Sequence, residues 1–207
     1  MEEVLRYLGA GANAPKELCE TVAAVDAELE KIVQPRWVWK VIPLGDACPL
    51  PLTGKLADTM LSQCDSAVVL CCTLGAQFDA LLRTLQTKDM ARAAIADAWG
   101  SACVESGCDA AEREIAARFP GRYLTDRFSP GYGDLPLTIH PAFCTLLDAQ
   151  RRLGVHVTDS YLLNPQKTVT AVIGLSDEPQ MARIRGCAYC SMRETCLLRK
   201  GGKRCAL

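Results

Sequence analysis

The sequence predicts a mixed domain of helices and strands, of the α/β or α+β class. Strand-like runs and helical patterns follow one another along the whole chain. The 207 residues suffice for one domain with its own core. Hydrophobic residues make up 49% of the chain and charged residues 23%, which is typical of a soluble globular protein.

The first half of the chain alternates between helical and strand patterns. Residues 1–13 predict a short helix ending near Gly9, and Pro15 begins a second helix that stops at Pro35. Residues 37–44 predict a strand, residues 46–51 a loop and residues 56–61 a helix. Residues 66–73 are apolar without interruption, as expected of a central strand covered on both faces.

The second half begins at Gly75, where that strand ends. We expect helices over residues 78–85 and 89–119, then an ordered loop over residues 122–138. Residues 140–153 predict one helix with Pro141 in its first turn. Residues 155–164 and 169–174 are strand-like, and the tail from residue 182 is basic and rich in cysteine.

The charge of the chain is nearly balanced, with 23 basic and 24 acidic residues and a net charge of -1. This balance does not favour nucleic acid as a partner. Glu2 and Glu3 stand where a secretion signal would be basic, and the longest apolar run, around residues 67–76, is too short for a bilayer. We therefore expect a cytoplasmic protein without a membrane partner.

The most informative segment is Arg127-Phe-Ser-Pro-Gly-Tyr-Gly-Asp-Leu-Pro-Leu137. Its Pro-Gly pair predicts a type II turn, in which glycine supplies the positive φ. Arginine offers a planar fork for a carboxylate, and tyrosine offers a flat face that suits a nucleobase. From these residues alone, a ligand site and a rigid surface turn with a packed tyrosine are both open.

The segment resembles the Arg-x-x-Pro-Gly-Tyr motif of the reactivation domain of cobalamin-dependent methionine synthase. It departs from the family pattern after Tyr132, where only Pro136 keeps its place. A second segment, Val157-Thr-Asp-Ser-Tyr-x-x-x-Pro165-x-x-Thr-Val-Thr-Ala171, resembles the family's Leu-Thr-Glu-Ser-Phe-x-x-x-Pro-x-x-Ser-Val-Ser-Gly. The resemblance covers roughly residues 37–175.

The resemblance implies an α+β fold, a twisted antiparallel sheet with flanking helices. We expect an N-terminal helical segment over residues 1–36, the S-adenosylmethionine-binding domain over 37–180 and a cysteine-rich basic tail over 181–207. The implied role is reductive reactivation of an oxidised corrinoid. The cobalamin would come in trans from a methionine synthase or related corrinoid methyltransferase, because the chain has no Asp-x-His-x-x-Gly motif. Flavodoxin or ferredoxin would donate the electron.

The resemblance also implies roles for individual residues. Arg127 would bind the carboxylate of S-adenosylmethionine, and Ser129 and Gly131 would contact the ligand through their backbones. Tyr132 would lie beside the ligand or at the corrinoid face. Glu105 aligns with a family glutamate on the long helix and would hold the α-amino group or lie near the sulfonium. The alternative is that Glu105 is a solvated side chain of the helix without a role in binding. Tyr132 and Glu105 are the candidate catalytic residues.

Four of the twelve cysteines are crowded into the tail: Cys187, Cys190, Cys196 and Cys205. Four thiolates at this density suit a 4Fe-4S cluster or a tetrahedral zinc ion, and free thiols are the remaining alternative. The other cysteines lie mostly in apolar stretches of the sequence, and we expect them to be small buried hydrophobic residues.

Two other functions stay open at this point. One is a small-molecule methyltransferase, although the chain lacks the Gly-rich loop after a first strand that such enzymes use. The other is a zinc-binding interaction module built around the tail.

Overall fold

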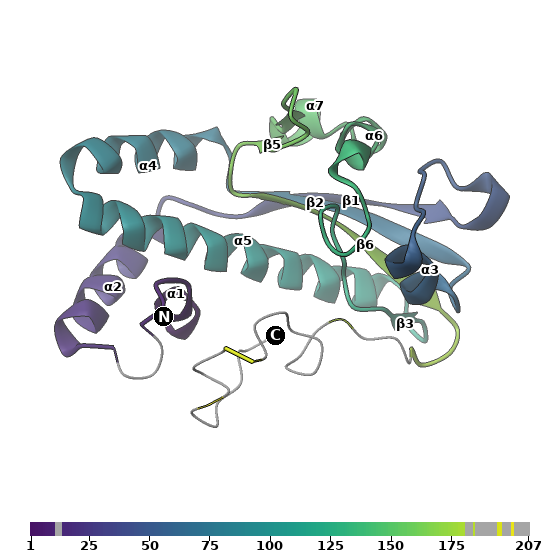
Figure 1. The fold of residues 1–207 in the computed structure, drawn as a ribbon, viewed down its shortest axis with the longest axis horizontal. Coiled ribbons are helices and arrows are strands. Elements are labelled where there is room, and N and C mark those ends of the chain that lie inside the picture. The colour runs from purple at the N-terminus through teal and green to yellow at the C-terminus, as the bar shows by residue number, and fades with distance from the viewer. Residues whose placement is uncertain (11–13, 181–183, 185–193, 196–199, 201–207) are drawn as a thin grey trace.

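A four-stranded antiparallel sheet lies between two layers of helices in the computed structural model, which describes residues 1–10, 14–180, 184, 194–195 and 200 (Figure 1). The strand order is β1-β2-β6-β3. β1 is Arg36–Pro43, β2 is Ser66–Thr73, β6 is Thr168–Ser176 and β3 is Tyr123–Leu124. All pairings are antiparallel, which confirms the predicted α+β class and the sheet with flanking helices.

The central position of β2 explains its unbroken apolar sequence. β2 pairs with β1 on one side and β6 on the other, and residues 67–73 are all buried. Val68, Leu70 and Cys72 face one helical layer, whereas Ala67, Val69 and Cys71 face the other. Because both faces are covered, neither set of alternate positions needs polar side chains.

One helical layer consists of α1 (Glu2–Tyr7), α2 (Lys16–Leu29), α4 (Ala76–Lys88) and α5 (Met90–Arg118). α5 runs along the sheet, and α1 and α2 lie beside it (Figure 1). Asp89 caps α5 by accepting the backbone N–H of Arg92. Val4, Leu5, Val22 and Val25 bring the first two helices into the same buried cluster as α5 and β2.

The opposite face of the sheet is covered by shorter elements. These are α3 (Lys55–Leu61), α6 (His140–Leu147) and α7 (Ala149–Leu153), with the short 3-10 turns η2 (Gly45–Ala47) and η3 (Leu137–Ile139). Phe143 and Leu147 of α6 are buried there beside Val69 and Val172. Among the helices that the structure describes, none combines the length and apolar character needed to cross a membrane.

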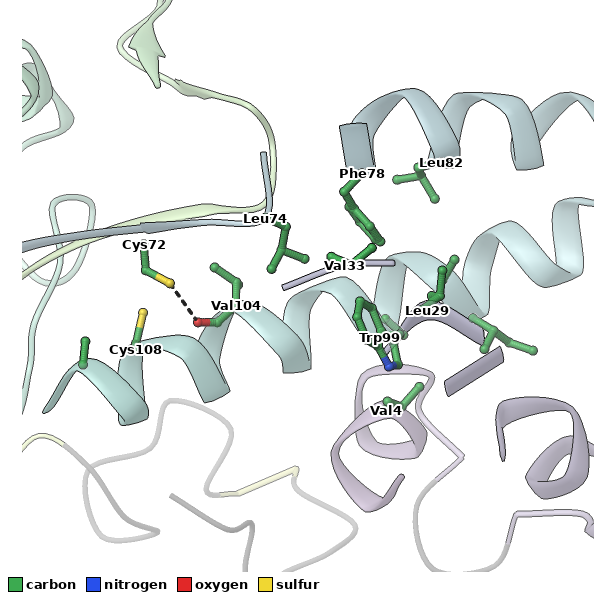
Figure 2. Close-up of a cluster of buried hydrophobic side chains, with 14 of the residues drawn as sticks. Val4, Leu29, Val33, Cys72, Leu74, Phe78, Leu82, Trp99, Val104 and Cys108 are labelled. Atoms are coloured by element: carbon green, nitrogen blue, oxygen red, sulfur yellow. Dashed lines mark hydrogen bonds between the residues drawn. The ribbon is translucent and has the colours of Figure 1, made fainter. Parts of the chain in front are cut away.

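α5 packs tightly against β2 at Gly107. A Cβ atom at this position would lie 2.5 Å from Pro35 Cβ and 2.8 Å from Cys72 Sγ, so only glycine fits. Cys72 and Cys108 point toward each other across this contact, and the Cys72 thiol donates to the backbone oxygen of Val104 (Figure 2). Cys71, Cys72 and Cys108 are fully buried, which confirms the expectation of small buried hydrophobes for these three.

Two segments differ from the sequence-based expectation. Residues 140–153 form two helices, because Asp148 takes the left-handed conformation (φ 51, ψ 43) and breaks the helix between α6 and α7. Residues 155–164 form a small hairpin of β4 (His156–Val157) and β5 (Leu163–Asn164). Thr158 closes the turn of this hairpin through two hydrogen bonds with the backbone of Leu162. The chain therefore reverses direction here and does not continue as one strand.

Candidate functional site

A bulge in the edge strand determines where Arg127 points. Leu124 pairs with Leu175 and lies on the α5 face of the sheet, whereas Phe128 pairs with Val172 and is buried on the opposite face. Residues 124 and 128 would share a face in a regular strand, since side chains alternate with a period of two. One extra residue therefore lies between them, and it turns Arg127 toward α5.

Thr125 stabilises this bulge. Its backbone N–H donates to the oxygen of Gly174 at 3.0 Å, and its hydroxyl accepts the Gly174 N–H at 2.8 Å. The Thr125 side chain is 4% exposed, so these bonds are shielded from water. A side-chain oxygen thus takes the place that a backbone oxygen has in a regular ladder.

Arg127 meets three carboxylates of α5. Its Nη2 lies 2.5 Å from Glu105 Oε2, and its Nη1 lies 2.6 Å from Asp109 Oδ1 and 3.0 Å from Glu112 Oε1. The arginine side chain is only 9% exposed. Burial alone would lower the pKa of Arg127, but the negative charge of Glu112 and the hydrogen bonds to Asp109 and Glu105 raise it overall. The guanidinium is therefore permanently charged.

We name Glu105, Asp109 and Glu112 the acidic stripe. They stand at positions i, i+4 and i+7 of α5, so they lie along one side of the helix. All three carboxylates contact the same guanidinium. Asp109 and Glu112 were absent from the sequence-based site. Their helical spacing from Glu105 was visible in the sequence, but the chain alone did not reveal that an edge strand brings Arg127 to that side.

The segment after Arg127 forms the expected type II turn. The Tyr132 N–H donates to the Ser129 oxygen at 3.0 Å, and Gly131 has a φ of +88 at the third turn position. A Cβ atom on Gly131 would also lie 2.9 Å from Leu137 Cδ2. Ser129 is half-buried and Gly131 is exposed, and the Tyr132 side chain is 51% exposed.

The predicted site residues are thus partly brought together. Arg127 and Glu105 are in direct contact, although they are 22 positions apart in the chain. No hydrogen bond or ion pair between described residues joins Tyr132 to either of them. The roles of Ser129, Gly131 and Tyr132 in ligand binding therefore stay predictions.

The second sequence motif also reaches α5. Lys167 lies within it and is 14% exposed in its side chain. Its Nζ donates to Ser101 Oγ at 2.8 Å and pairs with Asp97 at 2.9 Å. Ser101 precedes Glu105 by four positions, which places them one turn apart on the same side of the helix. The two motifs therefore converge on neighbouring turns of α5.

α1 places a tyrosine near the same stripe. The ring of Tyr7 lies under the Arg6 guanidinium, 4.4 Å from its carbon, and the side chain is 42% exposed. Burial raises the pKa of Tyr7, and the Glu105 carboxylate is close enough to add to that rise. The sequence pattern gave no signal for Tyr7, because its nearness to Glu105 depends on how α1 packs.

Among the described residues, surface hollows lie elsewhere. One of about 640 Å³ is lined by α6, α7 and the β4–β5 hairpin, and one of about 650 Å³ by residues 31–36 and the start of α4. The third, of about 440 Å³, lies around η2 and α3. None of these three includes Arg127, Glu105 or Tyr132.

The predicted metal ligands Cys187, Cys190, Cys196 and Cys205 lie outside the described residues. In the described part of the chain, no group of three His, Cys, Asp or Glu side chains could hold a metal ion. Ile184 is described, and its N–H donates to Asp126 Oδ2 at 2.9 Å. The chain beyond β6 therefore returns to the residue that precedes Arg127.

The fold places the chain in a class of α+β proteins with an antiparallel sheet between helical layers. No protein-family model matches the chain, and no curated protein matches it. Among solved structures, the fold is similar to the crystal structure of the MetH reactivation domain bound to AdoHcy, with a TM-score of 0.59 and 16% sequence identity. The match covers 90% of this chain and 73% of that one. This likeness establishes the fold.

Proposed function

We propose that the protein binds S-adenosylmethionine beside Arg127 and supports reductive reactivation of a corrinoid. The observation that carries this proposal is the contact between Arg127 and Glu105. Arg127 is expected to bind the carboxylate of the ligand, and Glu105 is expected to hold its α-amino group or lie near its sulfonium, and these two side chains are in contact. The fold is similar to that of a domain whose structure holds AdoHcy.

An amino acid can enter this cluster by exchanging partners. Its carboxylate takes one edge of the Arg127 guanidinium, and its ammonium group takes the carboxylate of Glu105 that is released. Each charge in the cluster then keeps an opposite charge as neighbour, which avoids the penalty for an unpaired charge. Glu105 is 44% exposed in its side chain, so a ligand can reach it from solvent.

The exposed Tyr132 is proposed to face the corrinoid of a partner. In the proposed reaction, one electron from flavodoxin or ferredoxin reduces Co(II) to Co(I), which takes the methyl group from the sulfonium and leaves S-adenosylhomocysteine. The protein would supply the bound methyl donor and the surface for transient docking. A metal cluster held by the four tail cysteines would shorten the path of that electron.

Calorimetry with S-adenosylmethionine tests the binding claim. We expect Arg127→Ala to weaken binding by about 1.5–3 kcal/mol, because a charge-assisted hydrogen bond is lost. Arg122→Ala is the matched control, since Arg122 pairs with Asp65 and Asp177 and has no part in the cluster. Unchanged affinity in Arg127→Ala removes this residue from the ligand site.

A reactivation assay tests the functional claim. A methionine synthase that lacks its own reactivation module is inactivated to Co(II) and mixed with this protein, a reductant and methyl-labelled S-adenosylmethionine. We expect label on the corrinoid only when this protein is present. Label transfer at the same rate without it would contradict the proposal. If label is transferred to another small molecule when the corrinoid enzyme is omitted, the protein is a direct small-molecule methyltransferase.

A further inference from the structure

We propose that two copies of this chain associate through the free edge of β1 and form a symmetric dimer with one continuous sheet. β1 stands first in the strand order β1-β2-β6-β3, so it pairs with β2 alone among the described strands. Its eight residues pair with β2 in an unbroken register. The other margin of the sheet is interrupted by the bulge before Phe128. A further strand can therefore add to the β1 margin more readily.

The hydrogen bonds of the sheet show which backbone groups of β1 point outward. Leu44, directly after β1, donates to the oxygen of Asp65 at 3.1 Å. Residues that bond to the neighbouring strand alternate in an antiparallel pair, so the even-numbered residues of β1 bond to β2. The N–H and C=O groups of Trp37, Trp39 and Val41 therefore point away from the sheet. No other backbone group among the described residues bonds to them.

The outward residues of β1 complement a second copy of themselves. With Trp39 on a two-fold axis, Trp39 lies opposite its copy, and Trp37 lies opposite Val41 of the second copy. Pairs of two aromatic side chains, or of an aromatic and a β-branched one, are favourable across antiparallel strands. Pro35 and Pro43 then lie opposite each other, just beyond the last bonds, so neither proline removes a donor from the ladder. Each of the three outward donors finds an acceptor on the other copy.

The side chains at this edge are held in place before association. Glu114 accepts the indole N–H groups of Trp37 and Trp39, each at 2.9 Å, so neither ring must lose much freedom when a second strand arrives. The Val41 side chain is 37% exposed and is therefore available for an apolar contact.

The charges of β1 also suit this register. Arg36 lies opposite Ile42 of the second copy and Lys40 lies opposite Val38, so no like charges meet directly. A two-fold axis joins the same edge of both chains and leaves neither edge free, which closes the assembly at two copies. This self-complementarity favours a second copy over a strand of unrelated sequence.

Sedimentation equilibrium tests the association. One pair of strands buries less surface than a stable interface of about 1,200–2,000 Å² needs, so we expect a dissociation constant on the order of 100 micromolar. The average mass should rise from monomer towards dimer between about one-tenth of this concentration and about ten times it. A monomeric mass over the whole range, or growth beyond two copies, overturns the proposal.

Amide hydrogen exchange identifies the surface. The N–H groups of Trp37, Trp39 and Val41 should exchange about fourfold more slowly at the upper concentration, because only the dimer protects them. The N–H groups of Val38 and Lys40 already bond to β2 and should not change. A dimer in which the three outward groups exchange at an unchanged rate uses another surface, and this result also overturns the proposal.

Val41→Pro provides the matching variant. It removes an outward donor and leaves the bonds to β2 in place, because the Val41 N–H points away from β2. We expect association to weaken at least about tenfold, whereas Val41→Thr, which keeps the N–H and the branched shape, should associate like the wild type. Circular dichroism confirms that both variants are folded, and the exchange experiment on the wild type decides alone if Val41→Pro is not. A folded Val41→Pro variant that associates like the wild type contradicts the proposal.

Discussion

The carboxylate of Asp134 accepts the backbone N–H groups of Lys55 at 2.7 Å and of Leu56 at 3.0 Å. These are the first residues of α3, whose free N–H groups need acceptors. A residue 79 positions later thus acts as the cap of this helix. The loop that bears Tyr132 is thereby tied to α3.

We predict that Asp134→Ala lowers the thermal midpoint of unfolding near neutral pH and leaves it unchanged in strong acid. The hydrogen bonds from Leu56 and Lys55 lower the pKa of Asp134 below its usual value. The cap therefore contributes fully above the unfolded pKa of about 3.9 and is lost as the pH falls through the lowered value. Thermal scans over this range check it, with Asp46→Ala as an exposed control. A pH-independent difference would contradict it.

Gly107→Ala should destabilise the fold. The added methyl group overlaps Pro35 and Cys72, which costs about 1–3 kcal/mol, and the higher helix propensity of alanine recovers about 1 kcal/mol at most. Urea unfolding measures the change, and Ser106→Ala on the exposed side of α5 serves as the control. A stabilised Gly107→Ala variant would mean that α5 does not approach β2 this closely.

Cys71 and Cys108 should resist alkylation in the folded protein. Burial raises the pKa of the Cys71 thiol, and the neighbouring Cys72 together with burial raises that of Cys108. Both lack the thiolate that reacts, and both are fully buried. Iodoacetamide labelling followed by peptide mass spectrometry should modify them only after denaturation. Rapid labelling of Cys108 under native conditions would reveal opening of the α5–β2 contact.

The indole N–H signals of two tryptophans should depend on the protonation of Glu114. Its two oxygens accept the indole N–H groups of Trp37 and Trp39, each at 2.9 Å, and these bonds lower the pKa of Glu114. The indole N–H signals of both residues should move together in a nuclear magnetic resonance titration, with one midpoint below the ordinary pKa of a glutamate. Glu114→Gln should abolish this shared step. Separate midpoints would argue against a common acceptor.

The tail cysteines should hold a metal if the tail belongs to the electron path. Protein prepared without oxygen should contain iron and sulfide and absorb visible light, whereas zinc alone would favour a structural site. Replacing Cys187 and Cys190 by serine should remove the metal, and Cys19→Ser is a control from the described part of the chain. Metal-free protein with four reactive tail thiols would rule out both sites.

The sequence could predict those features that depend on local pattern. The apolar run of β2 indicated a strand with two covered faces, and the Pro130-Gly131 pair indicated the turn. The break at Asp148 was missed, because the hydrophobic pattern continues through it and only the backbone conformation changes.

The site was predictable to the extent that it depends on a motif. The sequence indicates Arg127 and Glu105 separately, and their contact follows from tertiary structure. The contacts of Asp109 and Glu112 with Arg127 could not be predicted, because they depend on the bulge that turns Arg127 toward α5. Pairing of an edge strand with a helix face depends on register, which a single sequence does not encode locally.

The bulge between Leu124 and Phe128 has a further effect on how the protein behaves in solution. This strand forms one margin of the sheet, and a regular strand there would offer a row of free backbone donors and acceptors to another molecule. The extra residue interrupts that row. One inserted residue thus turns Arg127 toward the carboxylates of α5. The same residue makes this edge of the sheet a poor template for aggregation.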